Sequence, residues 1–529
     1  MRTLFKNGHI VSLDETNTIY SFLGIEKDHI CYLGNEEPKE KYNKIIDLKG
    51  QYIYPALTDS HLHLLYTLAI TSVGFDICEI KKDGISPNNL EGIKNKLISF
   101  VKENPSKKLI VANQYITSGI KENRLPTRHE LDNWCPNKEI AILNIDGHSG
   151  SFSSLFLKKI NLYKEDQNGI LSNKDYDLVS DKITDYLASK VNLFSLAKGL
   201  NNFTNDCIKY GIGRVCALEG NDNGRKDLQL SLITFLARRM KIKVRLYAQY
   251  HNLESLKNLT KKLLHLRLGG CNKWELDGAI GSHSASFYKP YTDNGISSNT
   301  YYEDKYVNMK LNEFVENKFQ FTCHAIGTKA IDQIVNAYKQ SKFKENKFTY
   351  RIDHFEFPSK EAVEFVTKEK IALAIQPGYS YIDKRFLRSY ERYLPKEIID
   401  NQIPLKDIVS GGGMILGSSD SPVQNINPYL QMQGMIDFYV LNQSISPLEA
   451  LRSYTSNASH ALNELDTGCL KINNKADFFI SSNDLINLKS NFFGEVKNSA
   501  LYIDGKMIKK QKSIFKTLLS LLFTKPKKI

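Results

Sequence analysis

Eight short β-rich runs, separated by segments of helical periodicity, are the feature of this 529-residue chain that most restricts its fold. Alternation of strand and helix favours parallel βαβ units, and eight such units predict a closed (β/α)8 barrel, a TIM barrel of the α/β class. The runs are Tyr52–Leu57, Arg214–Leu218, Val244–Tyr250, Lys273–Leu276, Phe319–Cys323, Tyr350–Ile352, Ile371–Ile375 and Met414–Gly417.

Two regions outside the barrel pattern predict further domains. Short strands with turn signals such as Asn7-Gly8 and Asp504-Gly505 occur near both ends of the chain. Because domain termini often lie close together, we expect the two ends to pair into one small β-sandwich domain. The long segment after the first run contains strands of its own, Leu109–Ala112 and Glu139–Leu143, and predicts an inserted subdomain. The expected domains are a sandwich of 1–50 plus 466–512, a barrel of 51–65 plus 196–465, an insertion of 66–195 and a basic tail of 513–529.

Composition and charge restrict the partners of the protein. Hydrophobic residues make up 41% and charged residues 24%, the balance of a folded protein with a large core. The net charge is +13, but the lysines are scattered, whereas a nucleic-acid binder gathers its basic residues in a stripe or module. We therefore expect a small-molecule substrate and no nucleic acid as partner, and leave a homo-oligomer open.

The cysteines and the apolar segments predict a cytoplasmic protein. None of the eight cysteines forms a CxxC pair, and they are interpreted as buried thiols of a reducing compartment. The N-terminal segment has no apolar signal core, and no apolar run has transmembrane length. The apolar stretch Ile514–Phe523, with Lys525, Lys527 and Lys528 behind it, is too short to span a bilayer. A docked terminal helix is the favoured interpretation, and a helix on a membrane surface the alternative.

A histidine pair at the start of the barrel pattern is the first candidate for chemistry. His61 and His63 follow the first run, and in a strand residues i and i+2 point to the same face, so both imidazoles can reach one metal ion. Alone, such a pair is more often a chance occurrence than a metal site. His324, His354 and Asp420 stand at the ends of the fifth, sixth and eighth runs, where barrel enzymes place their reactive residues. Together the five residues predict a transition-metal site, with zinc as the default ion and iron, manganese or cobalt as alternatives.

A lysine of the fourth run is a further candidate ligand. Lys273 inside a barrel would be costly as a cation, and burial would leave a neutral amine. Such an amine can take up carbon dioxide and become a carbamate that bridges two metal ions. The alternatives are that Lys273 reaches the surface or pairs with Asp277.

An ordered series of motifs covers nearly the whole chain. Its segments are Pro55-Ala-Leu-Thr-Asp-Ser-His-Leu-His63, Leu276-Asp-Gly-Ala-Ile-Gly-Ser-His283, Pro290-Tyr-Thr-Asp293, His324-Ala-Ile-Gly327, Arg351-Ile-Asp-His354, Gln376-Pro377, Gly417-Ser-Ser-Asp420-Ser-Pro-Val423, Ala450-Leu-Arg-Ser-Tyr-Thr455 and Gly468-Cys-Leu. The series resembles the amidohydrolase superfamily, and within it the amidohydrolase 3 family that includes N-substituted formamide deformylases. The chain departs from the family pattern at Ala56, His283 and Thr328, none of which is an expected metal ligand.

The resemblance implies a metal-dependent hydrolase that acts on a carbon–nitrogen bond other than a peptide bond. The expected metal ligands are His61, His63, Lys273, His324, His354 and Asp420, around one or two divalent ions, with Lys273 a candidate for carboxylation. Asp420 is expected to act as the catalytic base and then the acid, and His354 or His148 to steady the developing oxyanion. His148, Asp277, His283 and Glu219 are the expected substrate-binding residues.

Three interpretations stay open beside this one. The same metal site fits another bond, such as that of an ester, a lactone, a phosphotriester or an amidine, because one fold hosts many chemistries. A barrel that binds a metal or ligand without turnover is the second, although such proteins usually lack some of the ligands. His148 as a simple loop residue and Glu219 as an ordinary polar strand end are the third.

Overall fold

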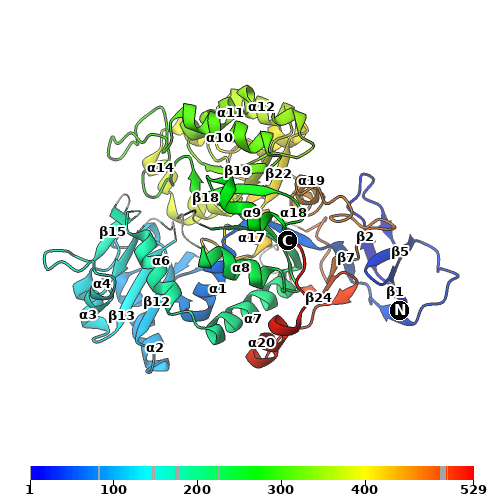
Figure 1. Cartoon of the computed structure of the whole chain (residues 1–529), viewed down its shortest axis with the longest axis horizontal. Coiled ribbons are helices and arrows are strands. Elements are labelled where there is room, and N and C mark those ends of the chain that lie inside the picture. The colour runs from blue at the N-terminus through cyan, green and yellow to red at the C-terminus, as the bar shows by residue number, and fades with distance from the viewer. Residues whose placement is uncertain are drawn as a thin grey trace.

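A closed ring of eight parallel strands stands at the centre of the computed structural model (Figure 1). The structure describes residues 2–81, 84–145, 147, 149–172, 175–176, 178–220, 222, 227–488, 496 and 498–529. In the ring, neighbouring strands follow the order β22-β21-β20-β19-β18-β17-β16-β8. A parallel bridge between Leu62 of β8 and Ser421, four residues beyond the end of β22, brings the two outer strands of this order together. The expected α/β barrel is confirmed.

The barrel strands lie within a few residues of the sequence pattern in most cases. Their bounds are β8 Leu57–Leu62, β16 Ile212–Glu219, β17 Lys243–Ala248, β18 Arg267–Glu275, β19 Gln320–Ala325, β20 Arg351–His354, β21 Ala372–Ile375 and β22 Met414–Gly417. Helices between them cover the outside of the ring; the longer ones are α7 Leu193–Tyr210, α8 Leu228–Ala237, α10 Asp304–Glu316, α11 Thr328–Gln340, α12 Lys360–Lys368, α17 Pro428–Ile436 and α18 Pro447–Tyr454. In α11 the buried residues include Ile331, Ile334, Val335 and Tyr338, the three- and four-residue spacing of a helix with one apolar face.

The first barrel strand differs from the sequence expectation. Tyr52–Pro55 forms a separate strand, β7, which pairs with β2 and β23 outside the barrel, and Ala56 alone separates it from β8. All six residues of β8 are buried. Two adjacent apolar strands with no turn residue between them look like one run in the sequence, which explains why the expected strand Tyr52–Leu57 and the expected barrel start at residue 51 are wrong.

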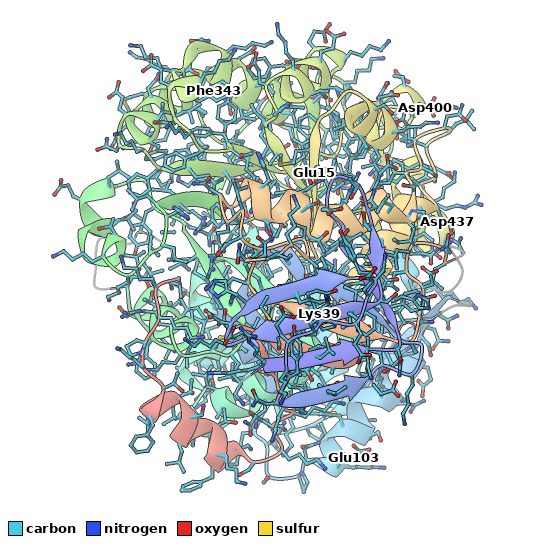
Figure 2. The ribbon with its side chains drawn as sticks, turned by 90° about the vertical axis from the view of Figure 1, so that its right-hand side faces the viewer. Glu15, Lys39, Glu103, Phe343, Asp400 and Asp437 are labelled. Carbon is cyan, nitrogen blue, oxygen red and sulfur yellow. The ribbon has the colours of Figure 1, made fainter. Side chains whose placement is uncertain are left out.

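Strands from both ends of the chain share one unit at the edge of the barrel. Its sheets follow the orders β5-β4-β1-β6 and β25-β24-β23-β7-β2-β3. The rings of Phe5 and Phe478 meet edge-on at 5.2 Å, and Phe5 and Tyr502 do so at 5.4 Å, so the two ends share a core. The strands are β1 Arg2–Lys6, β2 His9–Val11, β3 Ile19–Tyr20, β4 Phe22–Glu26, β5 His29–Gly34, β6 Lys44–Asp47, β23 Phe478–Ser481, β24 Asn498–Ile503 and β25 Lys506–Met507. Figure 2 looks onto this side of the molecule.

The segment between β8 and α7 forms the inserted subdomain. After helix α1, Leu64–Val73, it builds a five-stranded sheet in the order β15-β14-β13-β12-β9. The strands and main helices are β9 Gly74–Asp76, α2 Leu90–Glu103, β12 Leu109–Tyr115, α3 Arg128–Trp134, β13 Glu139–Asn144, β14 Ser149–Phe152, α4 Ser154–Lys159, β15 Ile170–Ser172 and α6 Ser180–Ser189. The side-chain amide of Gln114 donates to the carbonyl of Val423 at 3.1 Å and thereby ties the insertion to the loop that follows β22.

The final helix, α20 Ile514–Phe523, packs against α7. Thr517 and Leu521 are its buried residues, and Thr517 donates a hydrogen bond to the side chain of Asn201 on α7. The last residue, Ile529, is buried and donates its N–H to the carbonyl of Lys262 at 3.1 Å. Across the described parts of the chain, no helix combines the length and the apolarity that crossing a membrane requires.

Candidate metal centre

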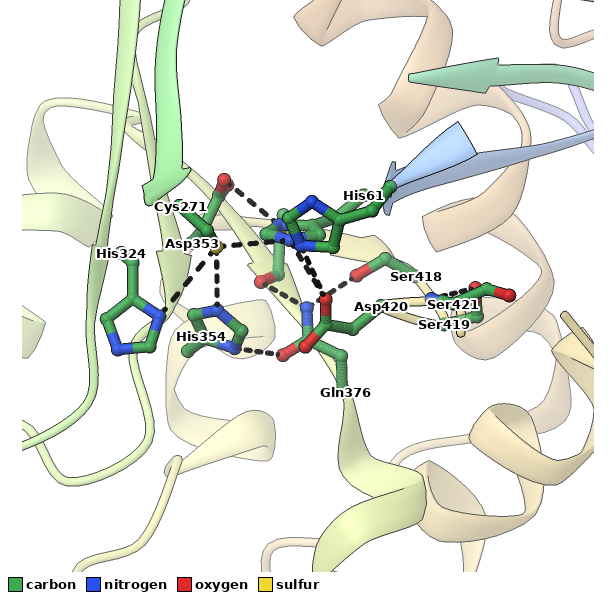
Figure 3. A network of polar contacts seen from close by, with 12 residues as sticks. His61, Cys271, His324, Asp353, His354, Gln376, Ser418, Ser419, Asp420 and Ser421 are labelled. Atoms are coloured by element: carbon green, nitrogen blue, oxygen red, sulfur yellow. Dashed lines mark hydrogen bonds and ion pairs between the residues drawn. The ribbon is translucent and has the colours of Figure 1, made fainter. Parts of the chain in front are cut away.

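Four histidines and one aspartate meet at the carboxyl ends of the barrel strands (Figure 3). His61 lies on β8 and His63 directly after it, and Nε2 of each faces Oδ1 of Asp420, at 3.2 and 3.4 Å. The His354 ring lies 5.1 Å from that of His61 and 4.3 Å from that of His324, centroid to centroid. The structure thus brings together five side chains that the sequence placed at four separate strand ends.

Cys271 completes this cluster, and the sequence analysis missed it. Its sulfur lies 3.4 Å from Nε2 of His61, 3.6 Å from Nε2 of His354 and 3.8 Å from Nδ1 of His324. The cysteine was grouped with seven other thiols because the fourth strand was expected to begin at Lys273, whereas β18 begins at Arg267. The i, i+2 spacing to Lys273 was the signal that would have found it, since both residues then belong to one face of the strand.

Each histidine that faces the sulfur has its other nitrogen held by a neighbour. Nδ1 of His61 lies 3.0 Å from Oδ2 of Asp353, and Nδ1 of His354 lies 2.8 Å from Oε1 of Gln376. Nε2 of His324 lies 3.3 Å from the carbonyl oxygen of Gly278. An N–H on the outer nitrogen leaves the inner nitrogen with a free lone pair, the arrangement found around metal-binding histidines.

Asp353 is itself fixed from behind. Arg351, two residues earlier on β20, donates from Nε to Oδ1 of Asp353, and both side chains are buried. Burial raises the pKa of Asp353, but the charges of Arg351 and His61 outweigh it and hold this pKa well below its usual range. A permanently ionised Asp353 keeps the His61 proton on the outer nitrogen.

Asp420 presents one oxygen to the centre of the cluster. Its Oδ2 accepts a hydrogen bond from the hydroxyl of Tyr379 at 3.1 Å, whereas Oδ1 is buried and, among the residues that the structure describes, has no hydrogen-bond donor. Burial raises the pKa of Asp420, but the neighbouring His61 and His63 lower it well below its usual range. An ionised, buried oxygen beside inward-facing nitrogen lone pairs fits a cation at this point.

Among the residues that the structure describes, three overlapping triads have ligand atoms within 4.8 Å of one another, close enough to hold metal ions. They are His61, His63 and Cys271; Cys271, His324 and His354; and His61, His354 and Asp420. Nitrogen, thiolate and carboxylate donors in this number suit zinc and its neighbours in the transition series.

The cluster opens into a cavity of about 930 Å3. Barrel residues such as Glu219 and Tyr379 line one part of it, and residues of the insertion such as Ile116 and Tyr176 line another. A volume of this size accommodates a small organic molecule. The half-buried Lys273 belongs to the lining, and its carbonyl accepts a hydrogen bond from the Tyr302 hydroxyl at 2.8 Å.

The four expected substrate-binding residues lie in different places. Glu219 lines the cavity, and its Oε1 accepts from the N–H of Leu65 at 2.9 Å; burial is the main cause that raises its pKa to about 7. His283 also lines the cavity, with Nε2 2.9 Å from an oxygen of Asp293. His148 lies outside the described residues.

Asp277 is buried behind His324 rather than in the cavity lining. Its two oxygens accept backbone N–H bonds from Ser286, Ile326 and Gly327 at 2.8 to 3.0 Å. These contacts favour a role in holding two loops beside the cluster, and the expected contact of Asp277 with substrate stays a prediction.

The comparisons with known proteins agree with the arrangement. The model of the amidohydrolase family (Amidohydro_3) matches residues 44–508. A Bacillus subtilis (strain 168) protein that carries the name of an amidohydrolase, YtcJ, is 23% identical, over 92% of this chain and 95% of its own. The N-substituted formamide deformylase of Arthrobacter pascens is 17% identical, over 94% and 96%.

A solved structure resembles the fold over its full length. It is an uncharacterised metal-dependent hydrolase from Pyrococcus horikoshii, with a TM-score of 0.72 and 21% identity, over 93% of this chain and 99% of that one. The match of the family model to most of the chain carries the assignment. This chain belongs to the amidohydrolase family.

Proposed function

We propose that the protein is a metal-dependent hydrolase that cleaves a carbon–nitrogen bond, other than a peptide bond, in a small amide-type substrate. The observation that carries the proposal is the convergence of histidine, cysteine and aspartate donors on one point at the floor of a cavity. The name of the Arthrobacter relative, N-substituted formamide deformylase, supports the bond type.

A divalent transition metal is the proposed cofactor, with zinc as the default and one or two ions in the site. The residues that would hold it are His61, His63, His324, His354 and Asp420, of which His61, His354 and Asp420 have ligand atoms within 4.8 Å of one another. When bound, such an ion polarises a carbonyl oxygen and lowers the pKa of water toward about 7.

Asp420 is placed to move the proton of the reaction. Its buried Oδ1 points to the cluster, and its Oδ2 is held by the Tyr379 hydroxyl, so the carboxylate is fixed while it accepts a proton from the attacking water. The same oxygen returns that proton to the leaving nitrogen, which departs as a neutral amine. His354, held by Gln376, has its ligand atom within 4.8 Å of that of Asp420 and would steady the charge that develops on the carbonyl oxygen.

The cavity walls select the substrate in this proposal. Glu219 and His283 offer the polar contacts, and side chains of the insertion such as Ile116 and Tyr176 form part of the wall. The protein is also proposed to be cytoplasmic, because its eight free cysteines are consistent with a reducing compartment.

The test is a substrate screen of the metal-loaded enzyme together with an Asp420→Asn variant. N-formyl and N-acetyl amines form one set, and esters, lactones and amidines with matched side groups form another. Turnover of the first set that is lost in Asp420→Asn, with metal content retained, supports the proposal. Turnover of the second set alone would move the assignment to another bond, and full activity of Asp420→Asn would remove the base role.

A further inference from the structure

The central sulfur of the metal cluster has no counterpart in the ligand set that the sequence predicts. Of the three triads close enough to hold a metal ion, two contain Cys271, one with His61 and His63 and the other with His324 and His354. The first pair comes from β8 and its end, and the second from β19 and β20. Cys271 is therefore the donor that lies between the two halves of the site.

The backbone of β18 is built to place this sulfur. Gly270 pairs with Cys323 of β19, but the next pair is Glu275 with His324, so the register skips residues 271–274. The irregularity begins at two glycines with positive φ, Gly269 at 104° and Gly270 at 119°. A Cβ on Gly269 would lie 1.8 Å from the carbonyl oxygen of Thr322, so only glycine allows the two strands to approach here.

We propose that the Cys271 thiolate bridges two metal ions in this protein, in the position where a carboxylated Lys273 was expected. The inference rests on the proposed metal-dependent hydrolase and deepens it. Loss of the thiol proton supplies the negative charge that a carbamate would supply, and a sulfur with more than one lone pair binds two soft or borderline ions at once. Lys273 is then not a metal ligand, and its half-buried side chain forms part of the cavity lining.

The thiolate gives the test an optical readout that is independent of turnover. Apoprotein is titrated with Co2+ and, separately, with Cd2+, and the near-ultraviolet thiolate-to-metal charge-transfer absorption is followed together with the metal content. Wild type and Lys273→Met are expected to show the band. Cys271→Ser is expected to lose it and to bind metal at least about tenfold more weakly. Cys469→Ser, which changes a cysteine outside the barrel, is the matched control and keeps the band.

The outcomes separate the bridge from the function. Metal binding without a charge-transfer band, or a band that survives in Cys271→Ser, overturns the thiolate bridge and leaves the hydrolase in place. Loss of metal in Lys273→Met with retention in Cys271→Ser assigns the bridge to the lysine and overturns the inference. No specific metal binding by wild type overturns the proposed function itself. Circular dichroism of each variant shows that it is folded.

A second, independent observation concerns the outer face of α20, which lies at the edge of the molecule (Figure 1). Phe515, Leu519, Leu522 and Phe523 are 69%, 38%, 68% and 82% exposed. Their i, i+4, i+7, i+8 spacing puts them on one side of the helix, opposite the buried Thr517 and Leu521. The helix thus docks by one face and leaves an apolar face uncovered.

The positive charge around the apolar face of α20 restricts the kind of partner that can bind there. The segment from Gly505 to Ile529 contains eight lysines and no acidic residue. Lys516, Lys525 and Lys528 are exposed, and Lys527 lies 3.8 Å from Asp504. A second copy of the chain, joined through a two-fold axis at this face, would bring the lysines of both copies together. An anionic surface with an apolar interior complements both features.

We propose that α20 binds the surface of an anionic lipid bilayer, with its apolar face in the headgroup boundary and its lysines on the lipid phosphates. The contacts of Ile529 with Lys262 and of Lys527 with Arg238 hold the chain behind the helix, so the helix need not detach to bind. Each lysine near an anionic surface strengthens binding about fivefold, and the four apolar side chains add the salt-resistant part.

Vesicle flotation of the full chain tests this proposal. Vesicles of phosphatidylcholine with phosphatidylglycerol are compared with vesicles of phosphatidylcholine alone. Wild type is expected to float with the anionic vesicles at least about fivefold more than with the neutral ones. Phe515→Ser with Phe523→Ser should abolish flotation, and Leu441→Ser, at a residue 84% exposed elsewhere, should not change it. No flotation of wild type, flotation unaffected by the double variant, or a dimer that the double variant dissociates would each overturn the proposal.

Discussion

Asp353 and His61 are both fully buried, and the carboxylate accepts a hydrogen bond from Nδ1 of the imidazole across 3.0 Å. The bond joins β20 to β8 on opposite parts of the ring and fixes which nitrogen of His61 faces the cluster. Asp353 is not a metal ligand in this proposal, but through this hydrogen bond it sets the tautomer of His61, which is one.

We expect Asp353→Asn to lower metal affinity by about 10- to 100-fold, because an amide that turns its N–H toward Nδ1 favours the wrong tautomer of His61. Competition with a chromophoric chelator measures the affinity. Asp400→Asn, on the surface, is the control and should leave it unchanged. An affinity in Asp353→Asn equal to that of wild type would show that the tautomer of His61 is set by another group.

The sequence predicted more of the site than of the strands that carry it. His324, His354 and Asp420 were found because barrel enzymes place reactive groups where strands end, and a strand end is visible as the edge of an apolar run. Asp353 and Gln376 act through hydrogen bonds between different strands, and such pairings have no local signature.

The misplaced strands have a common physical cause. β7 and β8 look like one run because the single Ala56 between them carries no turn signal. β18 looks short in the sequence because Gly269 and Gly270 resemble a loop, although both glycines, despite their positive φ values, pair with residues of β19. A hydrophobic pattern in the sequence indicates that a strand is buried, but it does not indicate which sheet the strand belongs to. The missed start of β18 is what hid Cys271.

Chelation is expected to destabilise the protein. Removal of a bound ion leaves Asp420 ionised and the buried histidines close together, and a ligand present at about 1,000 times its Kd stabilises the folded state by about 4 kcal/mol. Thermal unfolding with EDTA should therefore occur at a lower Tm than with zinc-saturated EDTA, and added zinc should restore the Tm. Equal Tm values in the two chelator samples would argue against a structural contribution of the metal.

We expect Gly269→Ala to lower the free energy of unfolding by more than the strain of a positive φ alone would cause. The new Cβ would meet the carbonyl oxygen of Thr322 at 1.8 Å, in addition to the strain of a positive φ. Gly50→Ala is the matched control, since Gly50 also has a positive φ, 80°, but no atom lies within 4 Å of the added Cβ. Urea unfolding should show Gly269→Ala to be less stable than Gly50→Ala by about 1–3 kcal/mol. A smaller difference would mean that β18 and β19 separate without cost, and that the close approach does not fix Cys271.

A buried acid beneath the barrel predicts the pH dependence of stability. Glu464 receives hydrogen bonds from Arg214, Arg245 and Arg267, on three adjacent strands. Burial raises the pKa of Glu464, but the three guanidinium groups outweigh it and hold this pKa well below its usual range. A carboxyl group with a lower pKa in the folded state stabilises that state above its unfolded-state pKa of about 4.3 and loses the contribution as the pH falls toward the folded-state value.

Glu464→Gln should therefore cost about 3–5 kcal/mol at pH 7, because three buried cations lose their counter-charge. The cost should shrink as the pH is lowered below about 4.3, because the unfolded wild-type chain then takes up a proton at Glu464, whereas the folded protein takes it up only at lower pH. Urea unfolding of both proteins at several pH values between 7 and 3.5 measures the difference. Glu449→Gln, which changes a half-buried helix-capping acid with no arginine among its hydrogen-bond partners in the described part of the chain, is the control and should show no comparable dependence. A difference between wild type and Glu464→Gln that stays constant over this range would show that the pKa of Glu464 is the same in the folded and the unfolded protein.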